Sequence, residues 1–452
     1  MNYKISDMIG VTGGLDKKEK ENNSLTSMSN YSENNDKNKE KPYKKKVIFN
    51  NFIDELSDII YNHTKASYNQ IQIKILQNLA FIFSYGGFNK ENLSFYVLDL
   101  SATGTGKSSI RKKLYSLLFK PIFEDLEQRN ELQNEKTGKL IKAIHNDIIS
   151  KEALFECFET IPTQIITIGE MGRALKRDDP IFKEIIELYG SNNINLPTFK
   201  NNKKHKYFIE DINFFFDGDT NLEYLGIKEF YEHLKGGLIN RCLISFNNQM
   251  RDFEDLPPNF KIKREDITIY NQFVKGILEF SKKTNYSPIN ENFQQNKHYI
   301  EFYKKIYNKE KELLEYKNPF SNLYIRVIQN LNSIIKTLHL IDCYLEGVFI
   351  NEVKETTIIK AIEFIDQFIA NYDNLINEII EYKEVQNELL EHKIINKIKE
   401  LLKTQDKANI REIYKPLKIS KNTLLITIQN YIRDNGIFKI IKRGKSTYIS
   451  YI

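Results

Sequence analysis

Residues Ser101–Ser108 read SATGTGKS and combine the residue types that grip a phosphate group. Gly104 and Gly106 allow the backbone to curl so that its N–H groups point toward one anion. Lys107 can then reach the outer phosphates of a nucleotide, and the hydroxyl of Ser108 can bind Mg²⁺. The sequence therefore predicts a site for ATP and Mg²⁺, with phosphate contacts from Thr103, Gly104, Thr105, Gly106, Lys107, Ser108 and Ser109.

This loop departs from the usual P-loop pattern at its first position, where Ser101 stands in place of glycine. A β-rich run, LSFYVLDLS, leads into the loop, and a helical stretch, SIRKKLYSLLF, follows it. Strand, loop and helix in this order are the context that the motif requires. We therefore favour a nucleotide site over a chance Gly-Lys-Ser turn.

Hydrolysis also requires a carboxylate at the end of a second buried strand. The run TQIITIGE ends in Glu170, which we predict to be the catalytic base and to belong to the Mg²⁺ site. Gly169 stands where the metal-side acid is expected, so Asp217 or Asp219 of the run INFFFDGDTN could supply it instead. An ordinary strand-end carboxylate is the alternative for Glu170.

Three further residues could act on the terminal phosphate. Thr220 or Asn221 could orient the attacking water, although a plain strand-to-turn junction would show the same residues. Arg241 comes directly before the run CLISFNN, where its guanidinium would point out of its own subunit. There it could complete the phosphate site of a neighbour, as arginine fingers do. A surface arginine is the alternative.

The elements that must position these residues are visible as apolar patterns. Four continuously apolar runs, LSFYVLDLS, TQIITIGE, INFFFDGDT and RCLISFNN, are typical of strands in a parallel sheet covered on both faces. Apolar residues at helical spacing precede the sheet and follow it, the latter from about Ile262 to Glu391. These stretches predict an N-terminal helical module and a helical bundle.

The last part of the chain changes character again. Three helical stretches, HKIINKIKELLKT, NIREIYKPL and SKNTLLITIQNYIRDNG, precede two short β runs, FKIIK and STYISYI, with Ser420 as the predicted N-cap of the third helix. This is a winged helix-turn-helix pattern, in which the third helix enters a DNA major groove and the hairpin contacts phosphates. A protein-docking module is the alternative. The predicted DNA contacts are Lys418, Lys421, Asn422, Arg433, Lys442, Arg443 and Lys445.

Composition limits the remaining classes. The 452 residues carry a net charge of only +6, so the position of a basic cluster matters more than its existence. Cys157, Cys242 and Cys343 are far apart, and neither a disulfide framework nor a zinc site is predicted. No apolar run approaches the roughly 18 residues that span a bilayer, and the N-terminus lacks a signal-peptide pattern. We expect a cytoplasmic protein with no membrane partner.

We predict five segments from these patterns. They are a disordered tail at 1–46, an N-terminal helical module at 47–92, an α/β P-loop ATPase core at 93–255, a helical lid or bundle at 256–385 and a winged-helix DNA-binding domain at 386–452.

The chain resembles the AAA+ ATPases, and more narrowly the superfamily three helicase-like ATPases of phages, plasmids and viruses. The resemblance rests on the order of four motifs, SATGTGKS, IITIGE, INFFFDGDT and GGLINR, followed by a helical lid. The resemblance covers about Leu93–Tyr372. It implies a hexameric ring with a DNA-gripping β-hairpin between the second and third motifs. Here LPTFKNNKKHKYFIEDI lies at that place, with Lys203, Lys204 and His205 near the tip.

The lid segment NLYIRVIQNLNSIIKTLHL is similar to the second sensor helix of MCM-like relatives. That similarity implies a place for Arg326 near a γ-phosphate, with a buried ion pair as the alternative.

The expected function is an ATP-dependent ring ATPase that translocates on or remodels DNA, such as a replicative helicase or initiator of a mobile element. Its partners would be single-stranded DNA in the pore, duplex DNA at the winged helix and further copies of itself. The alternative is a sequence-specific DNA-binding regulator whose oligomerisation is switched by nucleotide with little turnover. A GTPase is disfavoured because no NKxD segment is present.

Overall fold

The computed structural model describes the chain except for residues 1–46, 50–51, 135–141, 178, 192, 201–202, 250, 252–255, 257–260, 285–286 and 445. The tail predicted at 1–46 and the predicted DNA contact Lys445 therefore lie outside the described residues. The chain divides into two compact units between Asp373 and Asn374. This boundary falls within one long helix, α14 (Glu355–Leu402).

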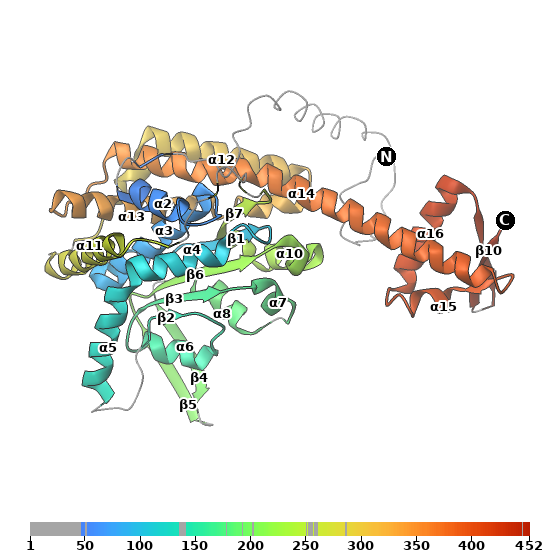
Figure 1. Ribbon diagram of the computed structural model, residues 1–452, viewed down its shortest axis with the longest axis horizontal. Coiled ribbons are helices and arrows are strands. Elements are labelled where there is room, and N and C mark those ends of the chain that lie inside the picture. The colour runs from blue at the N-terminus through green and yellow to red at the C-terminus, as the bar shows by residue number, and fades with distance from the viewer. Residues whose placement is uncertain are drawn as a thin grey trace. The chain divides into compact units, whose positions relative to one another are not determined.

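The first unit is built around a five-stranded parallel sheet (Figure 1). In spatial order its strands are β2 (Ile144–His145), β3 (Thr163–Ile168), β6 (Asn213–Thr220), β1 (Tyr96–Ser101) and β7 (Cys242–Asn247). Every residue of β1, β3, β6 and β7 is buried, which confirms the prediction that four apolar runs form a parallel sheet covered on both faces. The short edge strand β2 was not predicted, because two residues carry no readable pattern.

Helices cover both faces of this sheet. Phe81 of α3 packs against Phe215 of β6, and Phe158 of α6 packs against the next strand residue, Phe214. Since neighbouring residues of a strand point to opposite faces, α3 and α6 lie on opposite sides. The helices up to the last strand are α2 (Phe52–Tyr61), α3 (Tyr68–Phe83), η2 (Ser84–Phe88), α4 (Lys107–Leu114), η3 (Tyr115–Phe119), α5 (Lys120–Asn134), α6 (Lys151–Phe158), α7 (Met171–Lys176), α8 (Ile181–Leu188), α9 (Leu222–Leu225), α10 (Ile227–Gly236) and η4 (Ile239–Arg241).

The predicted N-terminal helical module is closely joined to the sheet. Helix α3 begins at a capping box, in which the Ser67 amide donates to Gln70 Oε1 over 2.8 Å and the Ser67 hydroxyl accepts from the Gln70 amide. It contacts β1, β3, β6 and β7, and it also packs against α11 and α13 of the following bundle. The bundle comprises α11 (Arg264–Lys283), η6 (Glu291–Gln295), α12 (Lys297–Glu315), η7 (Pro319–Leu323), α13 (Val327–Glu346) and the beginning of α14.

A two-stranded antiparallel hairpin lies between β3 and β6 in the chain, where the family resemblance implied one. Strands β4 (Ile194–Lys200) and β5 (Lys203–Ile209) extend away from the parallel sheet in Figure 1. Lys203 pairs with Lys200 next to the turn, and Lys204 and His205 follow it in the register. The side chains of these three predicted DNA contacts lie outside the described part of the chain.

The second unit contains the end of α14, two further helices and a three-stranded sheet of order β8-β10-β9. The elements are β8 (Ala408–Asn409), α15 (Ile410–Tyr414), α16 (Lys421–Asn435), β9 (Phe438–Arg443) and β10 (Ser446–Tyr451). Ser420 caps α16 by accepting from the Thr423 amide over 2.9 Å, as predicted. The apolar core of the unit is formed by Ile394, Ile395, Ile398, Ala408, Ile410, Ile413, Leu424, Ile428, Phe438 and Ile449.

Among the helices that the structure describes, none combines the length and the apolar character needed to cross a membrane.

Candidate nucleotide site

The SATGTGKS loop follows β1 at the carboxyl end of the sheet, the edge at which parallel α/β sheets bind ligands. Gly104 and Gly106 both have φ of 90°, a conformation that favours glycine. The Thr105 hydroxyl donates to the carbonyl of Ala102 over 2.8 Å and holds the turn closed. Helix α4 then begins at Lys107, and its first amides lack intrahelical acceptors. This geometry fits a phosphate group.

The loop is packed against the segment that precedes α3. A Cβ atom added to Gly106 would lie 2.9 Å from the amide nitrogen of Ala66 and 3.3 Å from backbone atoms of Lys65. Arg251, which follows β7, donates to the carbonyls of Tyr61 at 2.8 Å and Thr64 at 2.9 Å and so fixes this segment. The close approach leaves room for glycine alone at position 106.

The Lys107 ammonium group lies in the loop and is held by carbonyl groups. Its Nζ atom donates to the carbonyl of Ser101 and, over 2.9 Å, to that of Thr220. Burial lowers its pKa, and the nearby Asp99 and Asp219 oppose that shift. A half-buried cation bound to neutral oxygens gains strongly from a phosphate group. Ser108, the predicted Mg²⁺ ligand, is exposed beside it at the start of α4.

Of the two residues predicted to orient water, Asn221 contacts the loop. Its Nδ2 atom donates to the Thr103 hydroxyl over 2.8 Å, and its Oδ1 atom accepts from the Tyr224 amide over 2.8 Å. The Thr220 hydroxyl instead accepts from the Gly172 amide of α7 over 3.2 Å. The structure thus brings the end of β6 to the loop and directs the Asn221 amide toward it.

Glu170 lies at the end of β3 with φ of 54°, a value that is rare outside glycine. Its side chain is 65% exposed and forms an ion pair of 3.2 Å with Arg173. The neighbouring Gly169 lies beside Arg111 of α4, because a Cβ atom at position 169 would be 3.4 Å from the Arg111 Nη1 atom, an ordinary van der Waals contact.

Sequence patterns did not reveal a buried cluster of charges behind the loop. Lys74 of α3 is fully buried and forms ion pairs with Asp217 and, over 2.8 Å, with Asp219. Arg111 also pairs with Asp219. Burial raises the pKa of Asp99 to about 6, although the nearby Lys74 favours its charged form. These acids lie on the sheet face that α3 covers.

Gln70 and Gln77 place α3 against the same strands. The Gln70 side-chain amide donates to both carboxylate oxygens of Asp99, at 3.0 and 3.1 Å, and to the Ser101 hydroxyl at 2.8 Å. Gln77 donates to the carbonyls of Phe95 and Phe216 at 3.0 and 2.8 Å. The sequence signal for this wall is the polar row 70, 74 and 77, spaced so that the three residues share one face of α3.

Arg241 lies at the opposite edge of the sheet. Cys242 pairs with Tyr96 at the first residue of β1, whereas the loop follows the last, Ser101. Five residues of strand separate these levels by about 17 Å, at roughly 3.3 Å per residue. Arg241 therefore cannot act at the loop of its own sheet.

Arg326 lies near Arg241. The Arg241 guanidinium lies 5.8 Å from the ring centre of Tyr189 and donates to the Gly237 carbonyl over 2.6 Å. Burial, and then the nearby Arg326, lower the pKa of Arg241. Arg326 donates to Gln329 Oε1 over 3.2 Å. Within the described residues, the buried Nε atoms of both arginines have no hydrogen-bond partner. The pair suits an anion.

The predicted DNA contacts of the second unit lie on its surface. Lys421, Asn422 and Arg433 are exposed on α16, Lys418 precedes it, and Lys442 and Arg443 are exposed at the end of β9. Residues 408–452 contain nine Lys and Arg against two Asp and Glu, so the entire positive excess of the chain lies there.

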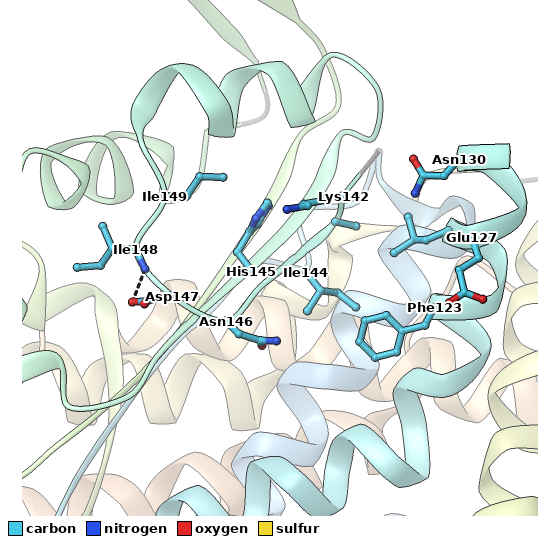
Figure 2. A pocket seen from close by; sticks show the side chains of 12 residues that line it. Phe123, Glu127, Asn130, Lys142, Ile144, His145, Asn146, Asp147, Ile148 and Ile149 are labelled. Atoms are coloured by element: carbon cyan, nitrogen blue, oxygen red, sulfur yellow. Dashed lines mark hydrogen bonds between the residues drawn. The ribbon is translucent and has the colours of Figure 1, made fainter. Parts of the chain in front are cut away.

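A separate pocket lies at the edge strand β2 (Figure 2). It is lined by α5 and by residues 142–149, among them His145, whose Nε2 atom lies 2.8 Å from Gln164 Oε1. Burial lowers the pKa of His145. None of the residues predicted to bind nucleotide lines this pocket.

The residues at the loop fit a nucleotide that brings its own metal ion. Gly104, Gly106 and Lys107 suit the phosphates, and the Ser108 hydroxyl suits Mg²⁺. Among the described residues, no three His, Cys, Asp or Glu side chains gather into a cation site. No protein-family model matches this chain, and no curated protein sequence is significantly similar to it.

Proposed function

We propose that this protein is an oligomeric ATPase that acts on DNA. The observation that carries the proposal is the loop between β1 and α4, with two glycines at φ of 90° and Lys107 half-buried among carbonyl groups. Loop amides and Lys107 bind the phosphates, and Ser108 holds Mg²⁺, which neutralises phosphate charge when bound. Asn221 positions the attacking water, and Glu170 accepts its proton.

The position of Arg241 supports an oligomer. Arg241 and Arg326 form a cationic pair at the amino edge of the sheet, about 17 Å from their own loop at roughly 3.3 Å per strand residue. An anion at this pair therefore comes from another molecule. A second copy that presents its nucleotide there would receive both guanidinium groups at its γ-phosphate. The family resemblance implies a hexameric ring for such an arrangement.

The distribution of charge supports DNA as the partner. The basic residues gather around α16 and β9 of the second unit, in the helix and hairpin order of a winged helix. In this proposal the second unit binds duplex DNA, and the β4–β5 hairpin grips a single strand in the pore of the ring. The motor is a replicative helicase or initiator of a mobile element.

The steady-state ATPase rate, measured with and without single-stranded DNA, tests this function. Lys107→Ala serves as the blank because it removes the cation and keeps the backbone of the loop. We expect hydrolysis that single strands stimulate and that the variant lacks. A rate equal to that of the blank under both conditions would refute the motor.

One observation favours a second function. Glu170 is exposed and paired with Arg173, and Gly169 carries no carboxylate, so slow hydrolysis is the expected result if neither is compensated. The protein would then be a DNA-binding regulator whose oligomerisation follows nucleotide binding. Nucleotide-dependent footprints on particular duplex sites, together with negligible turnover, would identify it.

A further inference from the structure

Gly169 and Asp219 lie at the same level of the sheet. Ile168 of β3 pairs with Gly218 of β6, so the next residues along these parallel strands, Gly169 and Asp219, are neighbours on the same face. Strand β6 also lies one place nearer to the loop than β3, because it pairs directly with β1. A carboxylate at position 219 is therefore beside the place that Gly169 leaves without one.

A single side chain connects the two positions. The Nη2 atom of Arg111 binds the carboxylate of Asp219, while its Nη1 atom would be 3.4 Å from a Cβ atom at position 169. Arg111 lies one helical turn after Lys107 on α4, and thus on the helix that the loop opens. The Arg111 guanidinium thus connects Asp219 to helix α4 and lies beside Gly169.

A second cation fixes Asp219 from the other side. Lys74 is fully buried and reaches Asp219 over 2.8 Å. A carboxylate that is only 6% exposed would be costly to bury without partners, and the ion pairs with Lys74 and Arg111 offset that cost. Its charge acts on the loop, since Asp219 is one of two acids that raise the pKa of Lys107 against the effect of burial.

We propose that Asp219 is the acidic residue of the nucleotide site, in place of an acid at position 169, and that Lys74 and Arg111 are its positioning residues. The inference rests on the proposed ATPase function. Asp219 supplies the negative charge that a nucleotide-bound Mg²⁺ requires near the loop. Glycine at position 169 is consistent with this assignment, because an acidic side chain there would compete with Asp219 for Arg111.

The test moves the carboxylate back to β3. Asp219→Asn is compared with a double variant that carries both Gly169→Asp and Asp219→Asn. The double variant restores the number of charges and places an acid beside Arg111. Two quantities are measured: the ATPase rate, and the factor by which Mg²⁺ changes the affinity for a fluorescent ATP analogue. We expect the single variant to lose about a hundredfold in rate and the effect of Mg²⁺. The double variant should regain most of both.

Asp217→Asn is the matched control, since Asp217 is equally buried and also binds Lys74, whereas the ion pair of Arg111 is with Asp219. Asp217→Asn should keep the effect of Mg²⁺, and the unfolding temperatures of both variants are measured alongside. A normal rate and Mg²⁺ effect in Asp219→Asn would overturn the proposal. A folded double variant without recovery would also overturn it, and this arm remains if Asp219→Asn alone does not fold.

The positioning role is tested at Arg111. Arg111→Gln should reduce the effect of Mg²⁺ on affinity, and Arg111→Lys should restore part of it; equal behaviour of the two variants contradicts the role.

Comparing the wild-type protein with Lys107→Ala separates this inference from the proposed function. If wild type and Lys107→Ala bind nucleotide equally weakly, the ATPase proposal fails. If wild type binds nucleotide and Lys107→Ala does not, only the assignment of Asp219 is in question.

Discussion

Gly106 meets two independent constraints at the candidate site. Its φ of 90° strains any residue with a Cβ atom, and the amide of Ala66 lies 2.9 Å from where that atom would be. The loop between β1 and α4 is therefore shaped by the segment before α3 as well as by its own glycines.

Gly106→Ala is expected to reduce the affinity for ATP roughly five- to 150-fold, because the strain of roughly 1–3 kcal/mol must be relieved by moving the loop. Isothermal titration with ATP and Mg²⁺ measures this effect. Gly236→Ala is the control, since a Cβ atom there meets nothing within 4 Å. Unchanged affinity in Gly106→Ala would show that the observed loop conformation is not the one that binds nucleotide.

Asp99 makes stability depend on pH. Burial raises its pKa from 3.8 to about 6, so the folded state holds a proton on Asp99 more tightly than the unfolded state. Its contribution to the free energy of unfolding is fully present below pH 3.8 and is lost as the pH rises through about 6. Across this window, wild type should lose stability relative to Asp99→Asn.

Urea denaturation of both proteins at several values between pH 4 and 7 tests this dependence. The difference between the two curves isolates Asp99, because the other titrating groups are shared. A difference that stays constant with pH, or that changes in favour of wild type as the pH rises, contradicts the raised pKa.

At the scale of elements, local patterns predicted the parts of the site but not what joins them. The four long strands were predictable because each is apolar throughout, and the loop because its residues are adjacent in sequence. The wall formed by α3 could not be predicted, because the partners of Lys74 lie about 140 residues later in the chain. A local sequence pattern carries no information about contacts at such a separation. For the same reason, the approach of Arg326 to Arg241 was not predictable.

Helix α16 and strand β9 make separable predictions about DNA. Lys442→Ala combined with Arg443→Ala should weaken duplex binding and reduce the slope of log affinity against log salt by about 2, because each phosphate contact contributes about 0.9. Fluorescence anisotropy with a short duplex at several salt concentrations measures the slope. Lys228→Ala with Lys235→Ala on α10 removes the same charge from exposed positions and should leave it unchanged. Equal slopes in wild type and the first variant would favour the protein-docking alternative.

At the scale of the whole molecule, the sheet separates the two halves of the proposed ATPase site. Lys107 lies at its carboxyl edge and Arg241 at its amino edge, so a complete site needs the first edge of one copy and the second edge of another. Lys107→Ala and Arg241→Ala each break every interface of a uniform assembly. A mixture of the two variants contains interfaces in which the Arg241→Ala copy gives an intact loop and the Lys107→Ala copy gives an intact arginine.

Mixing the two inactive variants should therefore restore part of the ATPase activity, with a maximum near equal amounts, whereas an arginine that acts in its own subunit predicts no recovery at any ratio. The control mixes Lys107→Ala with a double variant that carries both Lys107→Ala and Arg241→Ala. No interface in this mixture has an intact loop. Because recovery needs only one complete interface, even a dimer would show it.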